Sequence, residues 1–188
     1  MFCKKNAVLF LTSILFALWG YFTYDVNRRF PNPENIKTEQ NETVDYKGIS
    51  ITAKEIEIYR YEQLIEHYPQ LESVYDLLGG EEKESNNCYY IVTVVMENRT
   101  KKIWNQGKES VVEWMLEVGE EYNGVDFFAF SELNWDYHKT MEPGESQEIK
   151  LPYSIREDYI TLEEAVKEDK KIIYSYYPTK NYFFYPGE

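Results

Sequence analysis

The chain contains few of the residues on which most enzymes and metal centres depend. Its 188 residues include only two cysteines and two histidines, and no Gly-x-Ser-x-Gly motif occurs. Two cysteines cannot form a disulfide framework, and a zinc site needs a denser cluster of cysteine and histidine than this sequence offers. Cys88 opens a strongly apolar segment, so we expect a buried thiol rather than a nucleophile. The sequence therefore predicts no catalytic residue, no metal ligand and no cofactor, and the protein is not expected to be an enzyme.

Basic residues are also scarce. The chain has 20 Lys and Arg against 33 Asp and Glu, which gives a formal net charge of −13. Nucleic acid is excluded as a partner because phosphate binding needs clustered Lys and Arg. Adjacent carboxylates such as Glu120 and Glu121 lack the spacing of a known calcium loop, so we interpret most of this charge as solvated surface and leave a cationic ligand open. An aromatic content of 17% argues against a disordered acidic tail.

One long uncharged run stands near the N-terminus. Residues 7–24 are 18 consecutive residues without a charge, and a helix of that length spans about 27 Å, close to the roughly 30 Å hydrocarbon core of a bilayer. Lys4 and Lys5 precede the run, and aromatic residues crowd its far end as they do at membrane interfaces. We predict one transmembrane helix with its N-terminus in the cytoplasm. A cleaved signal peptide is the alternative, although small residues are missing at the cleavage positions. The anchor residues are Leu9, Phe10, Leu15, Trp19 and Tyr21.

The sequence is predicted to divide into three parts. Residues 1–29 are the membrane anchor, and residues 30–46, which are polar and contain Pro31 and Pro33, are a linker. Residues 47–188 form an extracytoplasmic domain, expected to be monomeric, on a single-pass protein of the cell membrane. The chain after residue 29 carries 16 basic and 32 acidic residues, a formal charge of −16, so an anionic membrane surface would repel it.

Alternating apolar and polar residues predict a mainly β domain. In residues 49–58 apolar and polar residues alternate, but the alternation shifts by one position, which predicts a strand with a bulge. Residues 88–98 are apolar at both odd and even positions, as in a central strand. Residues 61–79 have helical spacing interrupted by Pro69. About seven short strands at intervals of roughly ten residues predict an antiparallel β-sandwich with short helical insertions. The other expected elements are strands at 112–118, 146–155, 171–177 and 181–185, a β-turn at Glu142–Glu145 and a helix opened by the Thr161–Glu164 capping box.

The order of these motifs resembles that of a known group of proteins. A strand over residues 90–98 ends in Asn-x-Thr, the Glu142-Pro-Gly-Glu145 turn follows, and a pair of strands closes the chain. This arrangement resembles the small immunoglobulin-like domains, often grouped as telokin-like, on secreted or membrane-anchored proteins of Gram-positive bacteria. The resemblance covers residues 47–185 and implies an immunoglobulin-like sandwich of unknown function, with no catalytic residue to carry over. The helical segment at 61–79 departs from a minimal sandwich, so the topology of that edge is left open.

Aromatic residues near the C-terminus are the strongest candidate for a functional surface. On paired strands, alternation places some of them in the core and the others in a row on the outer face, where Tyr is typical of interfaces. The plain alternative is packing of the sheet alone. By parity, Tyr174, Tyr176 and Phe184 form one set and Tyr177, Phe183 and Tyr185 the other, and the sequence does not say which set is buried. The candidate partner contacts are Tyr174, Tyr176, Tyr177, Tyr182, Phe184 and Tyr185.

Together these features predict a non-enzymatic interaction module, tethered to the membrane and binding a protein or envelope partner outside the cytoplasm. A binding module for a cationic small molecule, a metal ion or a basic peptide is the alternative, and a hydrolase comes third. A flat apolar and aromatic patch would indicate the first function. A concave pocket with convergent polar groups would indicate the second.

Overall fold

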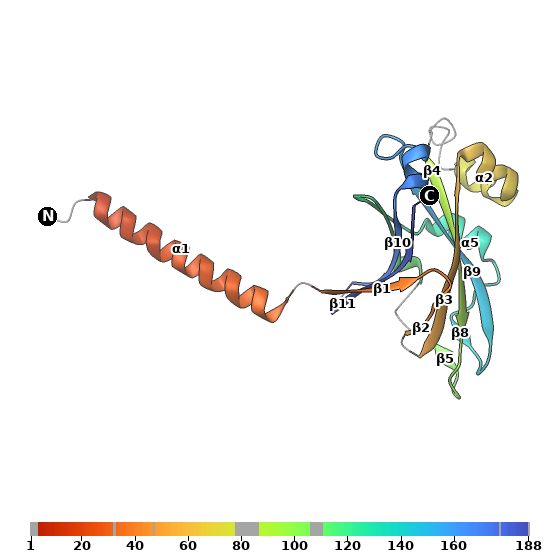
Figure 1. Ribbon diagram of the computed structural model, residues 1–188, viewed down its shortest axis with the longest axis horizontal. Helices are drawn as coiled ribbons and strands as arrows, with labels where there is room; N and C mark the ends of the chain where they lie inside the picture. Colours follow the sequence, from red (N-terminus) through yellow and green to blue (C-terminus); the bar gives the residue numbers. More distant parts are fainter. Residues whose placement is uncertain are drawn as a thin grey trace. The chain divides into compact units, whose positions relative to one another are not determined.

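The computed structural model describes residues 4–31, 33–46, 48–77, 87–105, 111–176 and 178–187, and the side chains of residues 4–9, 76 and 77 lie outside that description. The chain forms two compact units, Met1–Glu34 and Asn35–Glu188. The first unit contains α1 (Lys4–Arg29), which is drawn as one continuous helix in Figure 1. The helix expected at the N-terminus is therefore present.

The side chains of α1 are exposed from Phe10 to Tyr24. Of the predicted anchor residues, Phe10, Leu15, Trp19 and Tyr21 are 59–68% exposed, and the side chain of Leu9 lies outside the described residues. An ion pair between Arg29 and Asp25, with 2.9 Å between nitrogen and oxygen, stabilises the last turn. Within the described ranges, no helix combines the length and the apolar character that crossing a membrane requires. Insertion of α1 into a membrane stays a prediction.

The second unit contains two main sheets. In the five-stranded sheet the strand order is β1-β11-β10-β6-β7, and β11, β10, β6 and β7 pair antiparallel with their neighbours. In the four-stranded sheet the order is β2-β3-β4-β9, with every pair antiparallel. Strand β4 is central, as predicted. The strands of the first sheet are β1 (Glu34–Glu39), β6 (Met115–Val118), β7 (Glu121–Gly124), β10 (Lys170–Ser175) and β11 (Thr179–Tyr185), and those of the second are β2 (Thr43–Tyr46), β3 (Ile49–Tyr59), β4 (Cys88–Glu97) and β9 (Ser146–Ile155).

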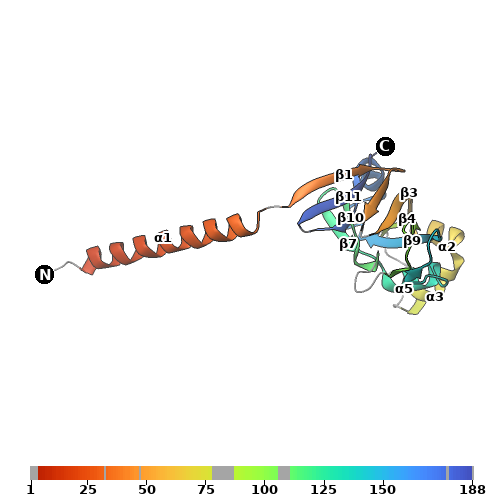
Figure 2. The ribbon, with the colours of Figure 1, turned by 90° about the horizontal axis from the view of Figure 1, so that it is seen from below.

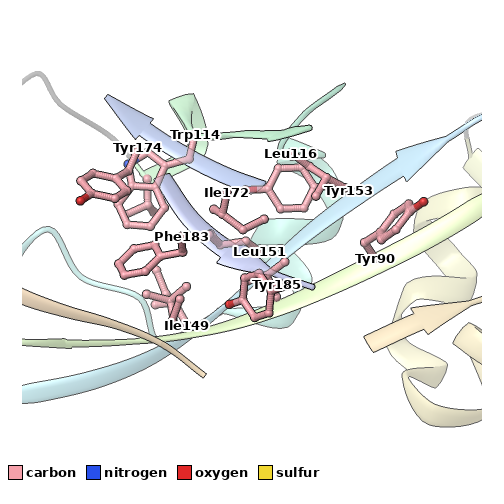
Figure 3. Packing of buried hydrophobic residues seen from close by; sticks show 14 of the residues in the cluster. Tyr90, Trp114, Leu116, Ile149, Leu151, Tyr153, Ile172, Tyr174, Phe183 and Tyr185 are labelled. Carbon is pink, nitrogen blue, oxygen red and sulfur yellow. The ribbon is translucent and has the colours of Figure 1, made fainter. Parts of the chain in front are cut away.

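The main hydrophobic core lies between the two sheets (Figure 3). Val92 and Val94 of β4 are fully buried there, opposite Leu116 of β6 and Ile172 of β10. Burial of apolar side chains on both inner faces is what holds two sheets together as a sandwich. The domain is thus mainly strands in several sheets and β-sandwich-like, which confirms the coarse fold prediction.

A layer of short helices covers the far face of the four-stranded sheet. Figure 2 shows these helices beside β4 and β9, on the side away from β10 and β11. They bury Tyr59, Tyr89 and Ile91, which point away from the main core, in a second hydrophobic cluster. The predicted break at Pro69 separates two of them, and residues 78 and 79 of the predicted helical segment lie outside the described residues. The helices of this layer are α2 (Tyr61–His67), η1 (Pro69–Leu71), α3 (Glu72–Leu77) and α5 (Phe127–Leu133).

Several local predictions are confirmed. The shift in the alternation of β3 corresponds to a register shift between Ala53 and Glu55. Helix α6 (Leu162–Lys167) begins with the complete Thr161 capping box. In the Glu142–Glu145 turn, Gly144 has φ of 80°, the conformation that a type II turn requires at its third residue. The strand predicted at 112–118 is shorter, because η2 (Val111–Glu113) precedes β6. A short ladder of β5 (Trp104–Asn105) and β8 (Thr140–Met141) completes the fold.

The predicted linker of residues 30–46 is wrong for most of its length, because β1 and β2 lie within it. Strand β1 is next to β11 and β2 pairs with β3, so both belong to the sandwich. Both are edge strands, and only Thr38 of β1 is buried. An edge strand exposes most of its side chains, so its stability comes from backbone pairing and leaves little apolar alternation in the sequence. The domain consequently begins at Asn35 and not at residue 47.

Candidate functional site

The candidate site is the face of the five-stranded sheet that points away from the core. Within the described part of residues 35–187, no helix lies on this side, whereas helices cover the far side of the other sheet (Figure 2). The strand register places Phe184, Lys171, Glu117 and Tyr122 in one row across four strands. We call this surface the outer face. It consists of Lys37, Met115, Glu117, Tyr122, Lys171, Ile173, Lys180, Tyr182 and Phe184.

A buried carboxylate organises the centre of the outer face. Glu117 is only 5% exposed, and its two oxygens accept hydrogen bonds from the ammonium groups of Lys171 and Lys180, the second at 2.6 Å. Burial alone would raise the pKa of Glu117, but the bonds from the two lysines outweigh it and hold that pKa below its ordinary value. The bond to Glu117 correspondingly raises the pKa of Lys171. This cluster, the Glu117 triad, therefore carries a net positive charge on a strongly acidic domain.

Aromatic rings lie among these lysines. The Lys171 ammonium is 5.8 Å from the centre of the Tyr182 ring, and that of Lys37 is 3.6 Å from the centre of the Phe184 ring. Cation–π contacts of this kind hold the long lysine side chains against the rings. Ile173 is fully buried but belongs to neither hydrophobic cluster, since it lies on the outer face beneath the surrounding side chains. The face is therefore ordered and half-buried, with aromatic and positively charged groups at its surface.

The structure separates the predicted partner contacts into two groups. Tyr182 and Phe184 are partly exposed on the outer face, and Tyr176 is 43% exposed. Burial, followed by the charges of Glu117 and Tyr122, raises the pKa of Tyr176 to about 12. Tyr177 lies outside the described residues.

Tyr174 and Tyr185 are not surface contacts, and this part of the prediction is wrong. They are 8% and 2% exposed in the main core, where the Tyr174 ring centre is 5.0 Å from that of Phe183. The hairpin register pairs Lys170 with Tyr185, so even-numbered residues of β10 share a face with odd-numbered residues of β11. The sequence analysis had instead placed even-numbered residues of both strands on one face and odd-numbered residues of both strands on the other, and this grouping is wrong.

The strand predicted at residues 112–118 contains Glu117, but the sequence analysis did not identify its two lysine partners. Lys171 and Lys180 come from strands 54 and 63 positions later in the chain. The available signal is that both lysines lie on the strands that carry Tyr182 and Phe184. That signal becomes specific only when the strand order is known, because β10 and β11 lie side by side next to β6.

The cysteine and histidine side chains that the structure describes make structural contacts. Cys88 is buried, its thiol donates to the Ile160 carbonyl at 3.6 Å, and burial raises its pKa to about 11, so it is a core thiol. His138 lies 2.5 Å from the Glu145 carboxylate at the surface, and His67 contacts the Gln63 carbonyl at 2.8 Å. In the described ranges no group of three or more His, Cys, Asp or Glu side chains is arranged to hold a metal ion.

A second polar cluster joins the helical layer to the four-stranded sheet. The hydroxyls of Tyr59 and Tyr68 donate to the Glu57 carboxylate at 2.6 and 2.7 Å, and Lys150 donates to the Tyr68 hydroxyl at 3.0 Å. Burial tends to raise the pKa of Glu57, but the two tyrosine hydroxyls outweigh it and hold that pKa below its ordinary value. Because its hydrogen bonds link β3 and β9 to Tyr68, which lies between α2 and η1, this cluster holds the helical layer on the sheet.

A family model described as "Domain of unknown function (DUF5028)" matches residues 23–181. Three solved structures of uncharacterised proteins from Gram-positive bacteria are similar in fold. A conserved hypothetical protein from Bacillus anthracis is 14% identical, with 74% of this chain and 88% of that chain covered and a TM-score of 0.45. A β-sandwich protein from Clostridium difficile 630 is 10% identical (81% and 95% covered, TM-score 0.44), and a functionally unknown protein from Listeria monocytogenes EGD-e is 8% identical (78% and 82%, TM-score 0.48). No curated protein matches the chain.

Proposed function

The chain belongs to the DUF5028 family of domains of unknown function, and we propose that it is a non-enzymatic interaction module, tethered to the membrane, that binds a protein or envelope partner outside the cytoplasm. The observation that carries this proposal is the outer face. It combines half-exposed aromatic rings with lysines held in fixed positions by Glu117. Tyr is among the residues that contribute most to binding energy at interfaces, and lysines in fixed positions supply charge complementarity.

The charges of the outer face favour one kind of partner. Lys171 and Lys180 both donate to the one buried carboxylate of Glu117, which leaves a positive charge there although the domain as a whole is strongly acidic. Lys37, over the Phe184 ring, is paired with Glu39. A partner that presents acidic groups beside apolar ones would therefore be attracted to this face and repelled by the rest of the surface. The alternative of a cationic ligand draws its support only from the overall charge.

The tether is proposed from the sequence of the first unit. The run at residues 7–24 is uncharged and long enough to span the hydrocarbon core of a bilayer. Trp19 and Tyr21 near its C-terminal end are typical of the membrane interface. The domain starts at Asn35, so a short segment connects it to the proposed anchor.

We also propose that the sandwich is of the immunoglobulin-like type. Support comes from two facing sheets of antiparallel strands. Some strands that are neighbours in a sheet are not consecutive in the sequence, such as β6 and β10 or β4 and β9. Such connections between sheets are characteristic of Greek-key sandwiches.

A site-specific crosslinking experiment tests the proposed function. A photo-crosslinking amino acid at Tyr182 of the full chain, in membranes of its own cells, should give a discrete covalent adduct. The same amino acid at Trp135, which is 86% exposed but lies outside the outer face, is the matched control. Adducts that are absent from both positions, or identical at both, would argue against recognition through the outer face.

A further inference from the structure

A polar groove lies where an edge of the five-stranded sheet meets an edge of the four-stranded sheet. Strands β7 and β9 are the edge strands there, and the Asn123 amide of β7 donates to the Ser154 carbonyl of β9. The groove has a volume of about 320 Å³, at the lower end of the roughly 300–1,000 Å³ that is typical of small-molecule pockets. The lining residues used below are Asn87, Glu121, Asn123, Ile155, Arg156 and Tyr159.

Three segments that are far apart in the sequence converge on this groove. Glu121 begins β7, and Asn87 directly precedes β4. Arg156 and Tyr159 belong to the turn that follows β9, in which the Tyr159 N–H donates to the Arg156 carbonyl at 3.0 Å. Because strand ends and a hydrogen-bonded turn carry the lining side chains, the polar groups are held on a fixed framework.

Two charged side chains of the groove differ in how far they are neutralised. Within the described ranges, the half-exposed Glu121 carboxylate makes no ion pair and no hydrogen bond. The Arg156 guanidinium binds Asp158 at 2.6 Å through one nitrogen, so its charge is already balanced. It still has further N–H donors, because a guanidinium carries five. An anion would therefore be repelled by Glu121 and find no unpaired charge on Arg156, whereas a hydroxyl can donate to the first and accept from the second.

The side-chain amide of Asn87 adds a donor and an acceptor to the same lining. Asn87 is only 6% exposed, and among the residues that the structure describes its amide has no hydrogen-bond partner. An amide offers two N–H donors and one acceptor oxygen. A ligand with several hydroxyl groups can use both kinds of group at once.

An exposed aromatic ring stands beside these polar groups. Tyr159 is 62% exposed and lines the groove, whereas the apolar Ile155 is 5% exposed. The groove thus lacks the apolar wall that a hydrophobic ligand needs, but it has one flat ring with an apolar face. A pyranose ring combines an apolar C–H face with a rim of hydroxyl groups, and this combination matches the lining.

We propose that this groove binds a neutral hexopyranose ring. The hydroxyl groups of the sugar donate to Glu121 and to the Asn87 oxygen and accept from Arg156 and the Asn87 amide, while its C–H face packs on the Tyr159 ring. This site goes beyond the proposed partner-binding function of the outer face and does not depend on it.

NMR titration of the full chain tests the proposal, in a detergent whose headgroup is not a sugar. The probes are the methyl glycosides of glucose, galactose and N-acetylglucosamine, and at least one should bind with a Kd of about 10 mM or lower. Glucuronate should bind more weakly than glucose, owing to Glu121. Binding of none of the three glycosides would overturn the proposal. Tighter binding of glucuronate, or of ethanolamine, which would use Glu121 alone, would overturn the assignment of a neutral sugar.

Two glutamate variants locate the site. Glu121→Ala should weaken binding of the best glycoside by about tenfold or more, since a hydrogen bond to a charged group is lost. Glu120→Ala removes the adjacent exposed carboxylate, which does not line the groove, and should bind the glycoside as the wild type does. Equal affinities of the two variants would contradict the proposed site.

Two aromatic variants test the role of the ring. Tyr159→Ala should weaken binding of the same glycoside by at least about threefold and leave the melting temperature nearly unchanged, because the side chain is exposed. Trp135→Ala removes a ring that is 86% exposed outside the groove and should not alter binding. A Tyr159→Ala variant with the affinity of the wild type would show that no sugar packs on this ring.

Discussion

The carboxylate of Glu117 accepts a 2.6 Å hydrogen bond from Lys180, a residue 63 positions later in the chain. The two residues lie on β6 and β11, which flank β10. The second carboxylate oxygen accepts from Lys171 of β10 itself. One buried side chain therefore connects three strands and fixes the lysines that lie beside the aromatic rings of the outer face.

Replacing Glu117 with glutamine should destabilise the domain at neutral pH. Glutamine keeps the shape but leaves two lysines without a counter-charge, and we expect a loss of about 1–3 kcal/mol in the free energy of unfolding. The pKa of Glu117 is lowered in the folded state, so its contribution is present above the unfolded pKa of about 4.3 and is lost as the pH falls through the folded pKa. Urea unfolding at pH 7 and at pH 3 measures this.

The same measurements on Glu113→Gln provide the control. Glu113 is exposed and precedes β6, so its replacement should change the free energy of unfolding by less than about 0.5 kcal/mol. A Glu117→Gln variant as stable as wild type at pH 7, or a loss that persists unchanged at pH 3, would show that the Glu117 triad does not stabilise the fold.

Two tyrosines of the C-terminal hairpin should differ sharply when changed to alanine. Tyr174 is 8% exposed and packs on Phe183 and Trp114, so Tyr174→Ala should cost about 3–5 kcal/mol. Tyr176 is 43% exposed, and Tyr176→Ala should cost less than about 1 kcal/mol. Denaturant unfolding of both variants measures this difference. Similar losses for the two would mean that Tyr176, which follows β10, is packed as tightly as the core residue Tyr174.

Asn98 should be essential to the turn after β4. It is fully buried, and its amide donates to the carbonyls of Lys102 and Met141 at 2.8 and 2.9 Å. Its side-chain oxygen accepts from Thr100. Asn98→Ala leaves these groups unsatisfied and should cost about 2 kcal/mol or more in thermal or urea unfolding.

The neighbouring Arg99 is exposed and pairs with Glu97 at the surface, so Arg99→Ala serves as the matched control and should be nearly neutral. If both variants unfold at the same urea concentration as the wild type, the hydrogen bonds of Asn98 contribute nothing net. Asn98-Arg-Thr100 matches the acceptor motif of N-glycosylation, but the burial of Asn98 indicates a turn residue and not an acceptor.

Two fragments of the domain test the corrected boundary. A fragment of residues 34–187 contains β1 and β2, whereas a fragment of residues 47–187 lacks both. Removing β2 unpairs β3, including the Val44 and Ile51 pair, and removing β1 exposes one edge of β11. The shorter fragment should therefore unfold at a clearly lower urea concentration or aggregate. Equal stability of the fragments would restore residues 34–46 to the status of a linker.

Local patterns in the sequence determined many elements of the domain. The uniform apolar character of β4 indicated a central strand, and the shift in the alternation of β3 indicated its bulge. The capping box at Thr161 and the Pro-Gly turn before Glu145 are likewise complete signals within a few residues. These features depend on interactions between neighbours along the chain, and such interactions can be read without knowledge of the fold.

Only the tertiary structure decided which residues share a face and which strands form the edges. Side chains alternate with a period of two, so the choice between Tyr174 and Phe184 as a core residue depends on a hairpin register that cannot be read from either strand alone. Strand β1 has one buried side chain and is held by its pairing with β11, a contact between opposite ends of the domain. The Glu117 triad depends on both the strand register and the strand order. A charged group is stable in a buried position only where distant strands bring its partners within hydrogen-bond distance.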